Sequence, residues 1–273
     1  MYEWLPPDVE LMTDVSGADW VVARLRPWPT QGRVSVASFM PDAFEAYARV
    51  LHPLRYRGGE IDPLRWEEMA RRRGVTMEHT IGFAEVTGID PGDQPSLDDL
   101  EPLEGSLPDI TLRDLVGFLA RWTAVEELVW FGLWEGNGTW WKGAHGVLTS
   151  GPIEDVARKP IEDVARNLRI DDERDRVLRA TATFGTPQRR YFLVRGHLRS
   201  ASGLYAAAGE NSANLWWPQG RSWLVSTEVD GFSTYVGGSH ELVDALVSSD
   251  TIEALAASLE DPIDPGRYPS APG

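Results

Sequence analysis

Two carboxylates, Glu228 and Asp230, lie two positions apart within the aromatic and glycine-rich stretch Asn214–Ser239. If residues 222–230 form a strand, side chains two positions apart point to the same face, so both carboxylates would face one side of a sheet. A carboxylate pair can transfer protons, hold a hard cation or clamp an arginine. Arg221, at the start of the same strand, could supply that arginine.

The sequence Trp216-Trp217-Pro218 comes just before this strand. Neighbouring indole rings could form a platform on which a planar ligand or a sugar stacks. The alternative is that one tryptophan closes the hydrophobic core while the proline stiffens a turn.

Downstream of the carboxylates, Tyr235 is followed by Gly237, Gly238 and Ser239, which lead into an expected helix at His240. Glycines at a helix N-terminus can leave backbone N–H groups free to bind an anion. Ser239 is also a good N-cap residue, and the cap alone accounts for the pattern.

These residues make up one candidate ligand-binding site, with three more residues as its expected neighbours. Its members are Trp216, Trp217, Arg221, Glu228, Asp230, Tyr235, Gly237, Gly238 and Ser239, and the neighbours are Arg49, His52 and Glu135. We assign no catalytic role to any of them. No dinucleotide, Walker-type, zinc-protease, serine-hydrolase or EF-hand motif is present, so we expect no cofactor. The five histidines are scattered, and we expect no metal site.

The formal net charge of −16 opposes binding to the phosphate backbone of nucleic acid and to anionic membrane surfaces. A basic protein is the partner class that this charge would attract, although solubility alone can explain it. The chain has no cysteine, no apolar run long enough to span a bilayer and no signal-peptide pattern at its start. These features predict a cytoplasmic protein of unspecified oligomeric state.

Strand and helix patterns alternate irregularly along the chain, which favours an α+β fold with mainly antiparallel sheet and short helices packed on one face. The expected strands are 20–25, 33–39, 127–134, 190–198 and 222–229. The composition of 44–51 allows a helix or a strand, and we favour a strand. The expected helices are 63–73, 240–247, 251–259 and one that begins after an N-cap at Thr111, with short elements near 81–86 and 200–208. The charged segment 170–179 is expected to be exposed.

Residues 1–260 are predicted to form one co-folded unit with two lobes, 1–90 and 110–260. An acidic, proline-rich connection at about 88–110 would join them as a solvated linker. The sequence Pro-Ile-Glu-Asp-Val-Ala-Arg occurs twice, at 152–158 and 160–166, which indicates a surface segment that tolerates insertion. Residues 261–273 are expected to form a flexible tail.

Three stretches of the chain resemble a family of uncharacterised actinobacterial proteins. They are Phe44–Pro53, Glu127–Gly136 and the segment from Asn214-Leu-Trp-Trp-Pro to Tyr235-Val-Gly-Gly-Ser239. The resemblance covers both expected lobes and so implies that they fold together. It implies no activity and no catalytic residue.

Two functions therefore stand as hypotheses. The first is a non-catalytic protein that binds another protein, of a regulatory or immunity type, because the chain is acidic and lacks a catalytic motif. The second is a small-molecule or carbohydrate binder, or a hydrolase, that uses a cleft lined by tryptophans and carboxylates. The second requires that the candidate residues converge on one cavity.

Overall fold

The computed structural model describes residues 2–29, 33–56, 64–89, 100–140 and 173–263. The strands are β1 (Glu10–Leu11), β2 (Ala46–Leu51), β3 (Leu54–Tyr56), β4 (Leu100–Pro102), β5 (Leu128–Trp134), β6 (Thr183–Gly185), β7 (Arg190–His197), β8 (Leu215–Pro218), β9 (Leu224–Thr227), β10 (Ser233–Gly238) and β11 (Ala254–Ala257). The helices are α1 (Asp19–Val22), α2 (Trp66–Arg73), α3 (Phe83–Thr87), α4 (Asp109–Leu119), α8 (Glu173–Ala180), α9 (Ser200–Ala207) and α10 (His240–Val247). Single 3-10 turns lie at Ser16–Ala18, Val36–Ser38, Ala120–Trp122 and Gly138–Trp140.

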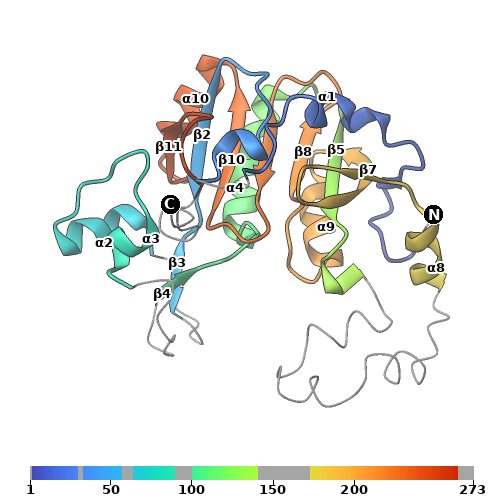
Figure 1. Ribbon diagram of the computed structural model, residues 1–273. Coiled ribbons are helices and arrows are strands. Elements are labelled where there is room, and N and C mark those ends of the chain that lie inside the picture. The colour runs from blue at the N-terminus through green and yellow to red at the C-terminus, as the bar shows by residue number, and fades with distance from the viewer. Residues whose placement is uncertain (1, 30–32, 57–63, 90–99, 141–172, 264–273) are drawn as a thin grey trace, which may run out of the picture.

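A single antiparallel sheet forms the centre of the molecule (Figure 1). Its strand order is β1-β7-β5-β8-β9-β10-β2-β11, and β6 also pairs with β7. This arrangement confirms the predicted α+β class with mainly antiparallel sheet. Strand β2 comes from the N-terminal part of the chain and lies between β10 and β11 from the C-terminal part. The two ends of the chain therefore contribute to one sheet.

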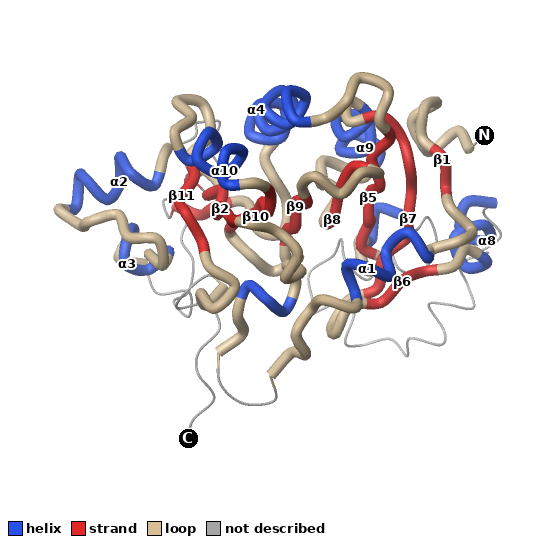
Figure 2. The backbone as a smooth tube through the Cα atoms, turned by 90° about the horizontal axis from the view of Figure 1, so that it is seen from above, coloured by secondary structure: helices blue, strands red, loops and turns tan. Residues whose placement is uncertain are grey.

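Helices α4, α9 and α10 cover one face of the sheet (Figure 2). In α4, Leu112, Leu115 and Leu119 recur at the spacing of one helix face, and all three are buried against the sheet. The predicted N-cap at Thr111 is wrong, because the N-cap of α4 is Pro108, three residues earlier. Thr111 is buried within the helix.

The opposite face is covered by the segment before β2, in which the sequence predicted two strands. That prediction is wrong, since the described residues between 16 and 40 contain α1, two 3-10 turns and one isolated β-bridge at Ser35, but no strand. Its apolar residues, among them Trp20, Val36 and Met40, pack onto the second face of the sheet. The β-branched composition thus reflects burial and not strand pairing.

The predicted helix at 251–259 is also wrong, because this segment contains strand β11. Ala254 and Ala256 pair with Val50 and Ala48 of β2. Alanine, leucine and glutamate have high helix propensity, but pairing with a buried strand overrides that preference here.

The charged segment around α8 is not exposed throughout, contrary to expectation. Arg174 and Asp175 are both buried. The Arg174 guanidinium lies 5.1 Å from the ring centroid of Trp4 and 5.5 Å from that of Trp140, and it donates to the Thr139 carbonyl at 2.8 Å. Cation–π contact thus explains how this arginine can be buried.

Helices α2 and α3 and strands β3 and β4 form a smaller unit at the β11 end of the sheet (Figure 1). Trp66, Phe83 and Val86 form its core together with Leu51 of β2 and Phe232. Helix α2 ends as predicted at Gly74, which adopts the left-handed conformation.

The predicted acidic connection is part of the fold where the structure describes it. Residues 90–99 lie outside the described residues, as do the repeated sequence at 152–166 and the tail from residue 264. After β4, the side chains of Ser106 and Leu107 are buried and Gly105 N–H donates to the Gly231 carbonyl at 2.8 Å. This second half of the connection therefore packs against the sheet.

Two glycines with similar backbone angles test how tightly this connection packs. Gly105 has φ +70° and Gly74 has φ +69°. A Cβ at Gly105 would lie 2.0 Å from the Val229 carbonyl oxygen, whereas nothing lies within 4 Å of one at Gly74. We predict that Gly74→Ala lowers the free energy of unfolding by about 1 kcal/mol, from backbone strain alone. Gly105→Ala should lower it by about 3 kcal/mol or more, because backbone atoms must move.

Urea unfolding followed by tryptophan fluorescence measures both changes. Equal losses for the two variants would contradict the close packing of Gly105 on Val229.

Candidate functional site

The aromatic residues of the predicted cleft lie in the core. Trp216 and Trp217 are each 1% exposed, and because they are consecutive in β8 they pack on opposite faces of the sheet. Tyr235 is 2% exposed and meets Phe39 edge to face, with the ring centroids 5.2 Å apart. No ring face of these three residues is open to a ligand, so the stacking platform does not form.

The expected glycine cradle is part of strand β10. Gly237 and Gly238 pair with Tyr47 and Ala46 of β2. A Cβ at Gly237 would lie 2.4 Å from the Phe44 ring, so the glycine makes room for an aromatic side chain. Ser239 does cap α10, because its hydroxyl accepts a hydrogen bond from Leu242 N–H at 3.2 Å. Of the two roles predicted for this segment, anion binding and helix capping, the structure shows the cap.

The two carboxylates are clamped by an arginine that the sequence did not single out. Arg189 lies 2.9 Å from Glu228 Oε1 and 2.5 Å from Asp230 Oδ2, and Glu228 also accepts Asp230 N–H at 2.6 Å. Burial disfavours the charge of Arg189, but the two carboxylates outweigh it, so its pKa is raised. Burial also raises the pKa of the nearby Tyr191, as does the charge of Glu228. The pair therefore has the third of its predicted uses, the clamping of an arginine.

Arg221 and Glu135, two further residues of the predicted site, make different contacts. Arg221 has φ +59° and lies over the ring of Trp20 at 5.1 Å. Glu135 pairs with Arg190 at 3.1 Å near the molecular surface.

A hollow of about 300 Å³ opens beside the Arg189 cluster. Its lining includes Trp134, Asn137, Asn211, Asn214 and Val229. The amide groups of the three asparagines bond to nearby backbone groups and so hold the loops together. The Arg189 guanidinium lies over the Trp134 ring, 5.8 Å from the ring centroid. The polar groups here are thus engaged in structural contacts.

Arg49 and His52 are both buried and join the smaller unit to the sheet. Arg49 donates to Ser233 Oγ at 2.9 Å and to the Ile81 carbonyl at 2.8 Å. The His52 ring lies 2.5 Å from the Leu103 carbonyl and 2.9 Å from Thr234 Oγ1. The Trp66 indole N–H donates to the His52 carbonyl at 2.7 Å. These two predicted site residues therefore position α2 and α3 instead of lining a cleft.

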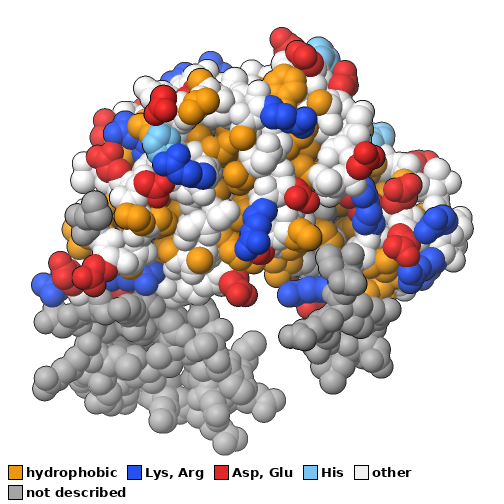
Figure 3. All heavy atoms as spheres, turned by 180° about the vertical axis from the view of Figure 1, so that it is seen from behind, with side chains coloured by type: hydrophobic (Ala, Val, Ile, Leu, Met, Phe, Trp, Pro, Cys, Tyr) orange, Lys and Arg blue, Asp and Glu red, His pale blue; other side chains and the backbone are white. Residues whose placement is uncertain are grey.

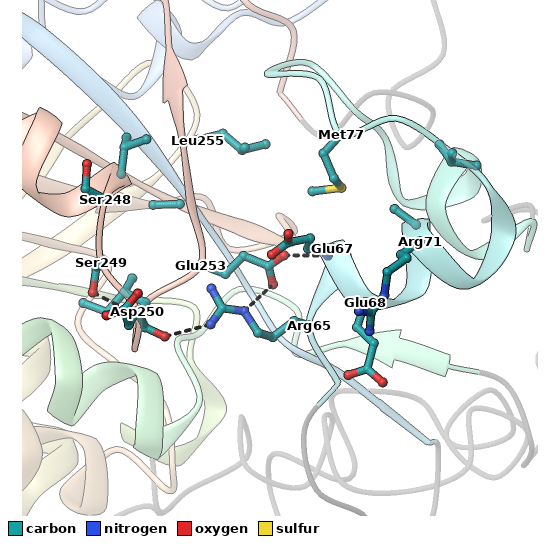
Figure 4. A pocket seen from close by; sticks show the side chains of 15 residues that line it. Arg65, Glu67, Glu68, Arg71, Met77, Ser248, Ser249, Asp250, Glu253 and Leu255 are labelled. Atoms are coloured by element: carbon teal, nitrogen blue, oxygen red, sulfur yellow. Dashed lines mark hydrogen bonds and ion pairs between the residues drawn. The ribbon is translucent and has the colours of Figure 1, made fainter.

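The unit that they position forms one wall of a larger groove, with a volume of about 930 Å³ (Figure 4). The other wall is β11 and the turn that follows α10. The apolar residues that line the groove, counted over both walls, are Ala70, Val75, Met77, Val247, Ile252, Ala254 and Leu255. Its polar lining consists of Arg65, Glu67, Glu68, Arg71, Ser248, Ser249, Asp250 and Glu253. The volume lies within the range of ligand-binding clefts, although charged and polar residues make up about half of the lining.

Strand β11 is the last strand of the sheet and turns backbone groups outward. Leu51 N–H donates to the Glu253 carbonyl at 2.9 Å, and hydrogen-bonded pairs alternate with non-bonded pairs along an antiparallel ladder. Leu255 and Ala257 therefore point their N–H and C=O groups at β2, whereas Ala254 and Ala256 point theirs away. Within the described part of the chain, no residue bonds these outward groups.

Glu253, next to Ala254, holds the helical wall of the groove in place. Its carboxylate accepts Trp66 N–H at 2.9 Å and Glu67 N–H at 2.6 Å, so it caps the N-terminus of α2. Arg65 donates to the Asp250 carbonyl at 2.8 Å and lies 4.0 Å from the Glu253 carboxylate. Burial raises the pKa of Glu253 above its ordinary value of 4.5, and the N–H donors oppose this shift.

This groove was not predicted, because residues 251–259 were expected to form a helix and not an edge strand. Within the described ranges no group of three or more His, Asp or Glu could hold a metal ion. No described helix is both long and apolar enough to cross a membrane.

We predict that Arg189→Ala lowers the free energy of unfolding by about 3 kcal/mol, because it leaves the buried Glu228 carboxylate without its cation. The double variant Arg189→Ala/Glu228→Gln should regain at least about 1 kcal/mol of this loss, since the charge is then gone. Arg190→Ala is the control, and removing its exposed ion pair should cost about 0.5 kcal/mol or less. Equal losses in the two single variants, measured by urea unfolding, would contradict the clamp.

A second prediction concerns pH. Because the folded-state pKa of Glu253 is raised, the folded protein binds more protons than the unfolded chain at pH values between 4.5 and that pKa. The stability of the native protein relative to Glu253→Gln should therefore fall as the pH rises through this window, and then level off. Unfolding free energies of both proteins over the window measure this difference. A difference that rises with pH would overturn the assignment.

Comparison of the chain with protein-family models, with curated proteins and with solved structures finds no match. The assignment of a function therefore rests on the geometry described above.

Proposed function

We propose that this chain is a protein-binding module that takes up an extended segment of a partner protein as an added strand beside β11. The observation that carries the proposal is the outward direction of the N–H and C=O groups of Ala254 and Ala256. Added strands bind through such main-chain groups, while side chains alternate into pockets on either side.

The side chains around β11 favour this mode of binding. Natural edge strands are usually protected by lysine, proline or a bulge, but β11 is Ala-Leu-Ala-Ala. Small side chains let another backbone approach closely. Met77 and Leu255 offer apolar surface in the groove to one side of the added strand (Figure 4). Val75 adds to this apolar lining.

The second hypothesis from the sequence, a small-molecule binder or hydrolase, has less support. Its tryptophans are buried in the core and its carboxylates bond to Arg189. The groove beside β11 is instead bordered by backbone groups that a protein segment can satisfy.

Proline substitutions at neighbouring positions test the proposed binding mode. The probes are three acetylated and amidated hexapeptides of the sequence Ser-Val-Ser-X-Ser-Val, in which X is lysine, serine or glutamate, so that X and the valines share one face of an extended strand. Ala256→Pro removes an outward N–H, so it should preserve the fold and weaken binding of the best of these peptides at least about tenfold. Ala256→Ser keeps that N–H and is the matched control, which should bind as the native protein does.

Ala257→Pro removes an N–H that points at β2, so it should lower the thermal midpoint instead. Binding is followed by NMR titration and folding by circular dichroism. The proposal is wrong if Ala256→Pro binds the peptides as well as Ala256→Ser does. It is also wrong if no hexapeptide at millimolar concentration shifts the amide signals of Ala254 and Ala256.

A further inference from the structure

The groove has a negatively charged floor. The Glu253 side chain is 8% exposed and next to Glu67, and the charge of Glu67 acts to raise the pKa of Glu253. Figure 4 shows both side chains at the centre of the groove, between Arg65 and the apolar pair Met77 and Leu255. Arg65 is the cation beside them, and its Nε is 4.0 Å from the Glu253 carboxylate.

Carboxylates outnumber guanidinium groups over the whole lining. The acidic residues are Glu67, Glu68, Asp250 and Glu253, and the basic residues are Arg65 and Arg71. Glu68 is paired with Arg72 on the next turn of α2, and Arg65 donates to a carbonyl. Glu67 is therefore the carboxylate of α2 best placed to meet a cation that enters the groove.

The face of the molecule seen in Figure 3 shows acidic and basic side chains intermingled, with no field of one sign. Within the groove the carboxylates instead lie beside partly desolvated apolar surface, where a charge interaction is stronger than in open water.

The free edge of β11 is also short. Just beyond it, the Ser258 N–H donates to the Asp261 carboxylate at 2.8 Å, which closes the edge at that residue. Asp261 also lies 3.6 Å from His79, in the loop between α2 and α3. At the other end, Arg65 and the Asp250 carbonyl close the groove. A strand rises about 3.3 Å per residue, so a segment of a few residues fills the space between these ends.

We propose that the groove selects a short extended segment in which an apolar residue meets Met77 and Leu255, and a lysine or arginine two positions away, on the same face of the added strand, meets Glu67 and Glu253. The inference rests on the proposed function, since it specifies which protein segment the edge of β11 takes up. A lysine or arginine supplies the charge that the lining lacks, and its binding relieves the repulsion between the two carboxylates.

The three hexapeptides of the previous experiment test this selectivity when they are compared on native protein at low salt. We expect the lysine peptide to bind about tenfold more tightly than the serine peptide, and the glutamate peptide to bind most weakly. Glu67→Gln should reduce the preference for lysine over serine to about twofold or less. Glu68→Gln is the control on the same helix and should leave the preference unchanged.

Thermal midpoints of both variants verify that they fold. Equal affinities for the lysine and serine peptides, with the amides of Ala254 and Ala256 still shifted, would overturn the charge selectivity and leave strand addition standing. If the preference for the lysine peptide over the serine peptide persists in Glu67→Gln and falls in Glu68→Gln, the assigned contact between the lysine and Glu67 is wrong. A panel in which no peptide shifts these amides would overturn the proposed function itself.

Discussion

The ladder between β2 and β11 determines the geometry of the groove through one register. The pairing of Ala254 with Val50 places the backbone groups of Ala254 and Ala256 at the outer edge of the sheet. The same register places Glu253 where its carboxylate caps α2, so the strand and the helical wall are positioned together. A shift of one residue would turn Glu253 to the other face of the sheet and leave the N-terminus of α2 without its acceptor.

The wall opposite β11 is held by buried polar contacts as well as by its small hydrophobic core. Arg49, in β2, bonds to the Ile81 carbonyl group. His52, just after β2, bonds to the Leu103 carbonyl group. Buried polar groups that are fully bonded specify one arrangement of the elements that they join. The groove therefore has a wall of defined position, which lowers the entropy cost of binding an extended segment.

Sequence patterns predicted the elements whose burial follows a simple period. Strands β5 and β7 and helices α4 and α10 are dense apolar segments bounded by clear turn residues, and they lie near their expected positions. The segment before β2 and strand β11 were predicted wrongly for opposite reasons. The first has a strand-like composition but covers a sheet face, and the second has a helix-like composition but pairs with β2. The open edge of β11 could not be found without the long-range pairing that creates it.

Residue-resolved amide hydrogen exchange in the free protein shows whether β11 leaves alternate backbone groups unbonded at the edge of the sheet. We predict slow exchange at Leu255 and Ala257, whose N–H groups point at β2, and fast exchange at Ala254 and Ala256. Equal and strong protection at all four amides would contradict the account, because the edge would then be covered already.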